Sequence, residues 1–332
     1  MKIQLPHTYA DIISLENLLA AWQEFVRGKR KKRDVQEFSL NLMDNIVSLH
    51  EDLQNRAYRH GGYHSFYIND PKRRHIHKAS VRDRLVHHAV YRILYPFFDR
   101  TFIADSYSCR KRKGTHKAIN RFRNFAYQAS RNHTRTCWVL KCDIRKFFAS
   151  IDHAALSQIL LEYIPDQDIM RLLRNIIESF QTGRQPDTGL PLGNLTSQLF
   201  VNIYMNVFDQ WVKHELKARQ YLRYADDFAL LSHDRNQLER TLPQTGRFLT
   251  QKLSLTLHPE KMCIKTLASG VDYLGWVQFS DHRVLRRATK CRMFARLREC
   301  TTDETVKSYV GLLRQGNAVT LQKRILSLRD PE

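Results

Sequence analysis

The chain has 332 residues, 42% of them hydrophobic and 26% charged, which is enough for one large domain with subdomains or two ordinary domains. Its formal net charge of +21 calls for a polyanionic partner, and nucleic acid is the usual one, with an anionic membrane surface as the alternative. No stretch reaches the length of apolar residues that a membrane span needs, and the N-terminus lacks the pattern of a signal peptide.

The cysteines and histidines predict no metal centre. The 6 cysteines are scattered without a CxxC pair, which is typical of reduced thiols in a cytoplasmic protein. The 15 histidines include "RHIH" and "HH", but no matching set of partner ligands accompanies them. We therefore expect a cytoplasmic protein that does not associate with membranes and has no zinc site.

The first 60 residues predict helices. The stretches "ISLENLLAAWQEF" and "FSLNLMDNIVSLHEDL" place apolar residues at helical spacing. Between them lies "RGKRKKR", with six basic residues in seven, which is either a solvated loop or a phosphate contact.

The centre of the chain alternates between strand and helix patterns. "YHSFYINDPKRRHIHKA" predicts a two-stranded hairpin, "VRDRLVHHAVYRILYPFF" a helix, and residues 138–144 a strand. Residues 199–216 predict a further helix, followed by a strand–turn–strand unit at 221–232. Beyond it, "LERTLPQTGRFLTQKLSL" predicts a helix, "MCIKTL" and "VDYLGWVQF" predict strands, and the tail from about Val284 predicts helix. This order of helices and antiparallel strands indicates an α+β fold.

Two adjacent aspartates, Asp226 and Asp227, occupy the turn of that strand–turn–strand unit in "YLRYADDFALLS". Side-by-side carboxylates repel, and burial makes ionising both costly, unless a divalent cation such as Mg²⁺ binds them. A third carboxylate, Asp143, ends another predicted strand. Three acids on two β-elements fit phosphoryl transfer assisted by two metal ions. By itself a Tyr-x-Asp-Asp string is a weak signal, because Asp-Asp can also form a plain turn.

The neighbouring blocks strengthen that signal. "YADD" with "KCDIRKFFASID" upstream resembles the palm of a reverse transcriptase. "PKRRHIH", "DRLVHHAV" and "DSYSCRKRKGTHKAI" resemble the blocks of the fingers, and "GLPLGNLTSQLFVNIYMNVFD" resembles the block that precedes the catalytic hairpin. "LTLHPEKMCIK" and "VDYLGW" resemble the lysine-bearing motif and the primer grip. These blocks follow the family's order over about residues 66–280.

The resemblance implies a right-hand polymerase fold and an RNA-directed DNA polymerase that uses dNTPs and two Mg²⁺ ions, with Mn²⁺ as a substitute. It implies a helical N-terminal segment over residues 1–65, fingers with part of the palm over 66–135, palm over 136–282 and a minimal helical thumb over 283–332.

The resemblance also assigns roles to single residues. Asp143, Asp226 and Asp227, with the carbonyl of Ile144, would bind the metals, and Lys261 would protonate the departing pyrophosphate. Phe148 would be the steric gate against a ribose 2′-hydroxyl, although a core aromatic is the alternative. The remaining dNTP-binding residues would be Lys72, Arg74, Leu192, Gly193 and Gln198, and the primer grip would be Leu274, Gly275 and Trp276.

One block departs from the common family pattern. Where many reverse transcriptases have QGxxxSP, this chain has "LGNLTSQ", so Leu192 replaces a polar residue and Gln198 a proline. This form resembles the reverse transcriptases of diversity-generating retroelements, which copy a template-repeat RNA with frequent errors opposite adenine. An apolar Leu192 cannot hydrogen-bond the nucleotide, which would weaken discrimination. In that branch a structured RNA and a small basic accessory protein are the expected partners.

Two alternatives remain open. A retron-like or other defence-associated enzyme would make cDNA on a non-coding RNA, although the SQ ending differs from retrons. A non-catalytic RNA-binding or splicing protein would not need all three acids, which are intact here. A group II intron maturase would carry a longer thumb than the roughly 50 residues that follow the palm.

Basic segments indicate where the RNA or the RNA–DNA hybrid would bind. In residues 110–135 basic residues alternate with aromatic ones, which we expect to pack inward, and the tail predicts a helix that recognises the shape of the hybrid. The expected nucleic-acid contacts are Lys29, Arg30, Lys31, Lys32, Arg33, Arg110, Lys111, Arg112, Lys113, Arg286, Arg287 and Lys290.

Overall fold

The computed structural model describes residues 3–69, 73–182, 186–299 and 302–327. The chain forms two compact units. The first unit comprises Met1–Ala104, Ile144–Trp211 and Arg247–Thr256, and the second comprises Asp105–Asp143, Val212–Gly246 and Leu257–Glu332.

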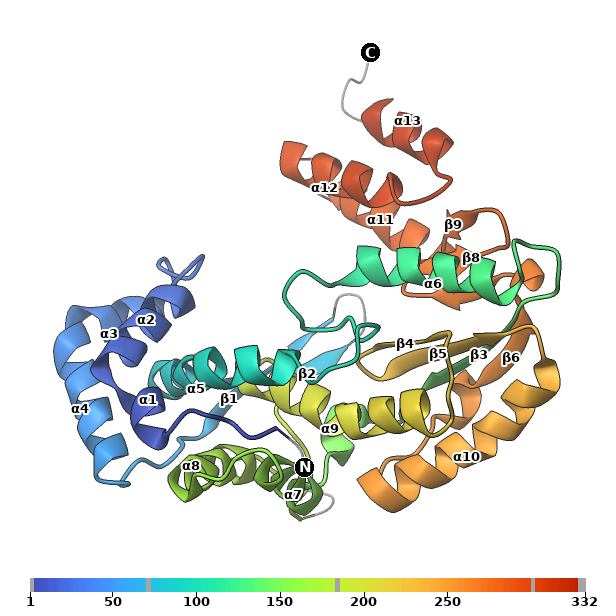
Figure 1. Ribbon diagram of the computed structural model, residues 1–332. Coiled ribbons are helices and arrows are strands. Elements are labelled where there is room, and N and C mark those ends of the chain that lie inside the picture. Colours follow the sequence, from blue (N-terminus) through green and yellow to red (C-terminus); the bar gives the residue numbers. More distant parts are fainter. Residues whose placement is uncertain (1–2, 70–72, 183–185, 300–301, 328–332) are drawn as a thin grey trace. The chain divides into compact units, whose positions relative to one another are not determined.

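The first unit is mainly helical (Figure 1). Its elements are α1 (Tyr9–Ile13), α2 (Leu15–Phe25), α3 (Arg33–Leu40), α4 (Leu42–Gln54), β1 (Tyr63–Ile68), β2 (Arg74–Ala79), α5 (Val81–Asp99), the 3₁₀ helix η1 (Phe147–Ser150), α7 (His153–Leu161), α8 (Gln167–Glu178) and most of α9 (Leu195–His214).

Helix α2 shows why its sequence forms a helix at this place. Leu18, Trp22 and Phe25 recur at helical spacing and are buried. The helix packs against α5, where the ring of Phe25 meets that of His88 edge-on with centroids 5.5 Å apart, and Trp22 contacts Phe38 of α3. The hydroxyl of Ser14 caps the helix by accepting the backbone N–H of Asn17 at 3.2 Å.

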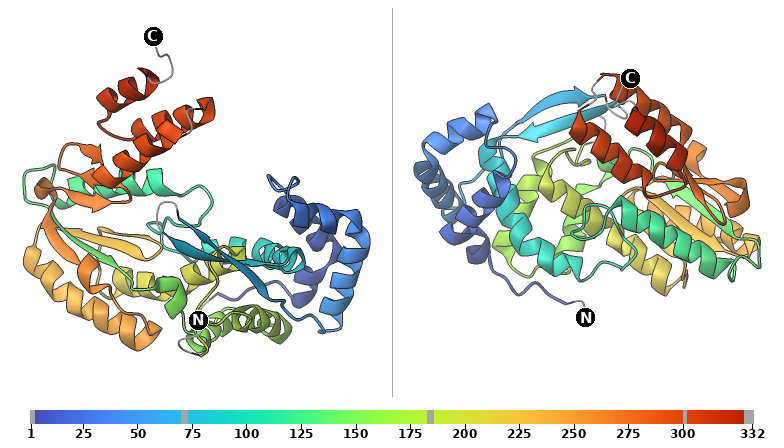
Figure 2. Two further views of the ribbon diagram at one scale, coloured as in Figure 1. Left: turned by 180° about the vertical axis from the view of Figure 1, so that it is seen from behind. Right: turned by 90° about the horizontal axis from the view of Figure 1, so that it is seen from above.

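Strands β1 and β2 form an antiparallel hairpin whose register runs from Tyr63 opposite Ala79 to Ile68 opposite Arg74. The hairpin extends away from the cluster of N-terminal helices (Figure 2). Phe66, Tyr67 and Ile68 are exposed although they are apolar. The predicted hairpin is thus confirmed for the residues on either side of its turn.

The second unit contains two antiparallel sheets, one with the strand order β4-β5-β3-β6 and one with the order β7-β8-β9. Its elements are α6 (Thr115–Ala129), β3 (Trp138–Asp143), β4 (Tyr221–Tyr224), β5 (Asp227–Ser232), most of α10 (Arg235–Leu253), η2 (Pro259–Lys261), β6 (Cys263–Thr266), η3 (Leu267–Ser269), β7 (Val271–Tyr273), β8 (Trp276–Gln278), β9 (Arg283–Leu285), α11 (Arg287–Glu299), α12 (Asp303–Leu313) and α13 (Val319–Ser327).

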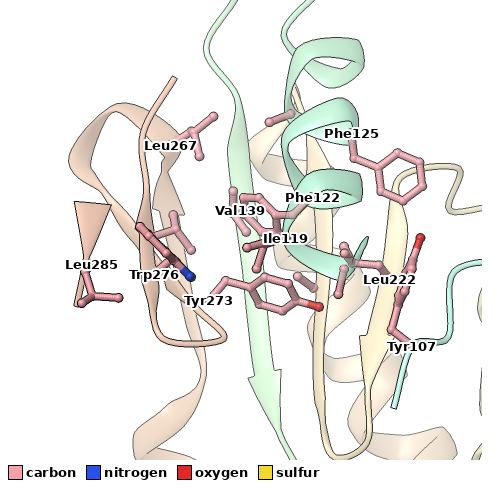
Figure 3. Packing of buried hydrophobic residues seen from close by; sticks show 14 of the residues in the cluster. Tyr107, Ile119, Phe122, Phe125, Val139, Leu222, Leu267, Tyr273, Trp276 and Leu285 are labelled. Carbon is pink, nitrogen blue, oxygen red and sulfur yellow. The ribbon is translucent and has the colours of Figure 1, made fainter. Parts of the chain in front are cut away.

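One hydrophobic core joins the elements of the second unit. Ile119 and Phe122 of α6 point toward Val139 of β3, Leu222 of β4 and Tyr273 of β7 (Figure 3). The rings of Phe122 and Tyr273 stack with their centroids 5.0 Å apart. Buried residues of α11, α12 and α13 belong to the same core. The ends of the strands are therefore fixed by packing on a large shared interior.

The structure confirms the α+β class and most of the predicted elements, with two corrections. The tail is not helical from Val284, because Arg283–Leu285 pair with β8 as strand β9 and the helix begins at Arg287. In the basic segment Phe122 and Phe125 are buried as expected, but Tyr127 is 47% exposed. In the described part of the chain no helix is long and apolar enough to cross a membrane.

Candidate active site

Three aspartates lie at one end of the four-stranded sheet. Asp143 is the last residue of β3 and Asp227 is the first of β5, and the antiparallel register pairs them directly. Asp226 precedes Asp227 in the two-residue turn between β4 and β5, where Ala225 has a φ of +55°. Because directly opposite residues have Cβ atoms about 4.5–5.5 Å apart, the strand pairing alone brings Asp143 and Asp227 together.

A buried arginine supports this turn. Arg223 in β4 is fully buried, and its Nη1 donates to the carbonyl of Ala225 at 3.1 Å while its Nη2 donates to Oγ of Ser106 at 3.1 Å. Arg223 was not among the residues predicted from the sequence. The available signal was an arginine between Leu222 and Tyr224 in a strand that must be buried, because a buried guanidinium needs several acceptors.

Two lysines neutralise part of the acidic cluster. Lys261 Nζ donates to Oδ1 of Asp143 at 2.7 Å, so the lysine singled out in the sequence does lie beside a carboxylate. Lys141 Nζ lies 3.4 Å from Oδ1 of Asp227. Lys141 was missed, although it lies two residues before Asp143 in the same strand and alternation therefore puts both on one face.

Burial disfavours the ionised forms of Asp226 and Asp227. Burial, with a further contribution from the charge of Asp143, raises the pKa of Asp226 to about 6. Burial also raises the pKa of Asp227, and Lys141 offsets part of that rise. Oδ1 of Asp227 is buried and accepts no hydrogen bond. The cluster therefore has more desolvated negative charge than its protein partners satisfy.

This donor set fits a hard divalent cation, which prefers carboxylate oxygens and would satisfy the unbonded Oδ1 of Asp227. Among the described residues, no three Asp, Glu, His or Cys side chains are already gathered as a ligand set. Lys141 and Lys261 hold two of the carboxylates instead, so a cation would have to displace their nitrogens. Ile144, the predicted carbonyl ligand, follows Asp143 directly and has a buried side chain.

The predicted primer grip is a second tight turn in the same unit. Leu274 and Gly275 join β7 to β8 with φ values of +50° and +86°, which suits glycine at the second position. The carbonyl of Gly275 accepts the N–H of Arg286 at 3.0 Å. Trp276 is 1% exposed, so its indole is part of the core.

The other basic residues predicted in this unit are mostly exposed. Arg287 and Lys290 are exposed on α11, and Lys111 and Arg112 are exposed before α6. Three others make contacts within the chain: Arg286 pairs with Asp272 at 3.0 Å, Arg110 Nη1 donates to the carbonyl of Ser106, and Lys113 lies over the ring of Tyr107.

In the first unit, the predicted steric gate lies in η1. Phe147 is buried, whereas Phe148 is only partly buried and contacts the ring of Phe147 edge-on, with centroids 5.6 Å apart. The backbone of η1 is tied to the following segment, since the carbonyl of Phe148 accepts the N–H of Leu190 at 2.8 Å. Of the two phenylalanines, Phe147 fills the core and Phe148 retains an accessible edge.

The residues Leu192–Asn194 pack against strand β2. The carbonyl of Leu192 accepts the N–H of His77 at 3.0 Å, and Asn194 Nδ2 donates to the carbonyl of His77 at 3.3 Å. Gly193 has a φ of +110°, and a Cβ there would lie 3.0 Å from a methyl carbon of Ile76. A glycine is therefore required by both the backbone and the close approach.

A pocket of about 390 Å³ adjoins this block within the first unit. Gly193 and Gln198 line it together with Lys29 from the basic loop, Lys78 of β2 and Arg84 of α5. Apolar residues, among them Phe25 and Ile76, form the rest of its lining. The pocket thus combines apolar surface with positive charge, which suits a nucleotide base with its phosphate.

The remaining predicted contacts of the first unit are at its surface. Arg74 is exposed at the start of β2, and Lys72 lies outside the described residues. Lys29 Nζ donates to the carbonyl of Phe25 at 2.8 Å, whereas Arg30, Lys31, Lys32 and Arg33 are exposed. Arg33 forms an ion pair with Glu37 at 2.8 Å.

The family model described as "Reverse transcriptase (RNA-dependent DNA polymerase)" matches residues 69–277, which is more than half of the chain and includes all three aspartates. The chain belongs to the reverse transcriptase family. Protein YkfC of Escherichia coli is 27% identical to this chain over 64% of the chain and 63% of its own length. The group II intron-encoded protein LtrA of Lactococcus lactis is 21% identical over 85% of the chain and 57% of its length. The chain thus spans about three fifths of these curated relatives.

Solved structures agree with the fold of this chain. Telomerase of Candida albicans, solved with a fragment of telomeric RNA, superposes with a TM-score of 0.53 at 11% identity, over 78% of this chain and 52% of that one. Apo telomerase of Candida tropicalis superposes with a TM-score of 0.51 at 12% identity, over 66% of this chain and 47% of that one. At these identities the likeness shows the fold alone, which is that of a right-hand polymerase.

Proposed function

We propose that this protein is an RNA-directed DNA polymerase that copies a dedicated template RNA into cDNA. The observation that carries this proposal is the direct pairing of Asp143 with Asp227 beside Asp226, on a rigid sheet of a strongly basic chain. We infer fingers over 66–135, a palm over 136–282 and a thumb over 283–332, preceded by the helical segment 1–65.

The carboxylates of Asp143, Asp226 and Asp227, with the carbonyl of Ile144, would hold Mg²⁺. Two such ions, when bound, lower the pKa of a primer 3′-hydroxyl and neutralise charge on the triphosphate. The buried sheet end keeps the carboxylates in place before the substrate arrives. Lys261, which lies beside Asp143, is the group that would give a proton to the departing pyrophosphate.

The nucleotide would be selected by residues of the first unit. The accessible edge of Phe148 would crowd a ribose 2′-hydroxyl, and Arg74, with Lys72, would bind the triphosphate. Leu192, Gly193 and Gln198 would face the nascent base pair. The turn of Leu274 and Gly275, supported from the core by Trp276, would contact the primer. Template RNA and the hybrid would bind the exposed basic residues of the loop at 29–33, of 110–113 and of α11.

Primer extension on an RNA template with Mg²⁺ tests the polymerase proposal. Asp226→Asn and Asp227→Asn should each reduce cDNA synthesis by at least about a hundredfold, because each removes a carboxylate that would hold the cations that neutralise charge on the triphosphate. RNA binding should stay near the wild-type level. Asp44→Asn is the matched control, since Asp44 is an exposed aspartate of α4. Full cDNA synthesis by either site variant would rule out the assigned metal site.

We infer further that the enzyme is of the diversity-generating type, with errors at template adenines and a small basic accessory protein. What supports this is Leu192, an apolar and partly buried residue whose carbonyl is bonded to β2. It stands where the resemblance expects a polar residue that contacts the nucleotide. Without that polar contact, discrimination between nucleotides rests on shape and stacking.

Sequencing of cDNA made on the chain's own flanking RNA tests this subtype. Wild type should make errors mainly at template adenines, and Leu192→Gln should lower that error rate severalfold, whereas Leu40→Gln at an 83% exposed leucine should not. Faithful wild-type cDNA would instead favour a retron-like or defence-associated role.

A further inference from the structure

A basic pocket of about 250 Å³ lies within the second unit. It is formed by α6, by the β8–β9 hairpin and by the segment between α12 and α13, three parts whose positions in the fold can be followed in Figure 1. The polar residues that matter in its lining are Arg123, Gln278, His282, Arg283, Arg314 and Asn317.

The pocket gathers positive charge without a balancing carboxylate. Arg123, Arg283 and Arg314 line it, and none of the described lining residues is acidic. His282 has an acidic partner, Asp281, at 2.7 Å, but that side chain is 82% exposed and does not line the pocket. Like charges that line one half-open pocket repel one another, and an anion bound between them would reduce that repulsion.

Two hydrogen-bond donors in the lining have no partner. Gln278 is 2% exposed, and its Nε2 donates to no acceptor in the described part of the chain. Nη1 of Arg283 is likewise buried and unbonded. The other nitrogens of Arg283 are engaged, Nε with the carbonyl of Gln315 and Nη2 with Oδ1 of Asn120 at 2.7 Å. Because buried donors without acceptors cost free energy, their presence in a pocket indicates an acceptor supplied from outside.

The position of the pocket separates it from the proposed primer grip. The turn Leu274–Gly275 lies at the start of β8, and the pocket lies at its other end, at Gln278 and beyond. Three residues of strand correspond to about 10 Å. A group bound in the pocket is therefore not the primer phosphate that the turn would contact.

We propose that this pocket binds a phosphate group, with the guanidinium groups of Arg123, Arg283 and Arg314 and the amide of Gln278 as donors. Guanidinium and amide groups suit tetrahedral oxyanions, since their donors converge on several oxygens. The phosphate belongs either to the backbone of a bound RNA or to free inorganic phosphate. The proposal that the pocket binds phosphate does not depend on the proposed polymerase activity, and it can be tested by binding measurements alone.

The test uses the double variant Arg123→Gln/Arg314→Gln, because both side chains are exposed and their replacement should leave the fold intact. Arg240→Gln, at an arginine that is 74% exposed on α10, is the control for loss of one charge, and twice its effect on RNA binding is the reference for the double variant. Inorganic phosphate is added at constant ionic strength while Tm is measured, and binding of a structured RNA is measured across a range of salt. Unchanged Tm without phosphate verifies folding.

We expect phosphate to raise the Tm of wild type and of Arg240→Gln in a saturable manner, and not that of the double variant. If RNA supplies the group, the slope of log affinity against log salt should fall by about 0.7–0.9 in the double variant beyond twice the change in Arg240→Gln. A lost Tm response with an unchanged slope assigns the pocket to free phosphate.

A second variant guards against an indirect effect. Gln278→Glu places a carboxylate where the anion would bind, so it should abolish the phosphate response while pairing with Arg283. The proposal is overturned if Gln278→Glu keeps the full response, or if the double variant matches Arg240→Gln in the phosphate response and twice its effect in RNA binding.

Discussion

The acidic turn and the basic pocket of the second unit differ in whether the chain itself supplies a counter-charge. At the turn, Lys261 and Lys141 stand beside Asp143 and Asp227, so the chain supplies provisional counter-charges. Among the described residues that line the pocket none is acidic, and Nη1 of Arg283 is buried without a hydrogen bond. A flexible lysine can leave when a cation arrives. A pocket without a counter-charge depends entirely on a ligand.

The largest effect is expected where the acidic turn depends on Arg223. Arg223→Met should leave the carbonyl of Ala225 and the hydroxyl of Ser106 without their donor, and should lower the free energy of unfolding by about 3 kcal/mol. Displacement of the turn by an ångström should also reduce cDNA synthesis by about a hundredfold. Chemical denaturation and primer extension measure the two effects. Arg223→Lys, which keeps the charge but not the fork, should fall between, and equal activity of Met and wild type would contradict the supporting role.

A pH-dependent effect follows from the raised pKa of Asp226. In the folded protein without divalent cations this carboxyl stays protonated up to a pKa of about 6, against 3.8 for an ordinary aspartate. Ionisation therefore disfavours the folded state, and stability from this group is lost as the pH rises from about 4 to about 6. Asp226→Asn should be the more stable protein at pH 7 in EDTA, by up to about 3 kcal/mol.

Denaturation of both proteins at pH 4 and pH 7 measures that difference, which should be small at pH 4. Mg²⁺ should reduce the difference at pH 7, because a bound cation stabilises the ionised carboxylate. If the difference in free energy of unfolding between the two proteins does not change with pH, the pKa of Asp226 is not raised by burial.

The wall of the basic pocket offers a smaller and purely steric test. A Cβ on Gly316 would lie 2.2 Å from the ring of Trp276, so Gly316→Ala should destabilise the protein by about 1–3 kcal/mol through overpacking. Gly311→Ala is the control within the same region, since nothing lies within 4 Å of its Cβ position in α12. It should stabilise the helix by about 0.5–1 kcal/mol. Thermal denaturation of the two variants should therefore give shifts of opposite sign.

The smallest effect is expected from the loss of Lys141, the lysine beside Asp227. Lys141→Met removes the nitrogen that competes with a cation for Oδ1 of Asp227. The concentration of Mg²⁺ that gives half-maximal cDNA synthesis should therefore decrease, by only severalfold, because the cation no longer competes with the lysine. An upward change would show that Lys141 assists metal binding and does not compete with it.

Local pattern carried much of the prediction. Alternation and helical spacing predicted the β1–β2 hairpin, the helix that contains Phe200 and the strand that ends at Asp143, because these signals depend only on which side chains must be buried. The Asp-Asp pair between two apolar strands predicted a turn that carries candidate metal-binding carboxylates. The strand at Arg283–Leu285 was missed, since three residues in a basic tail carry no periodicity and pair only because β8 is there to receive them.

By itself, the sequence determined the class of fold, the three candidate acidic residues and the excess of positive charge that would bind a polyanionic partner. Composition, spacing and motif order are properties of the chain, so they can be read without the structure. The tertiary structure alone decided that Asp143 pairs with Asp227, that buried Arg223 holds the turn and that Lys141 shares the acidic cluster. It also decided that Arg123, Gln278 and Arg314, far apart in the chain, line one pocket. Register and packing bring distant residues together, and neither can be read from the spacing of residues along a single strand or helix.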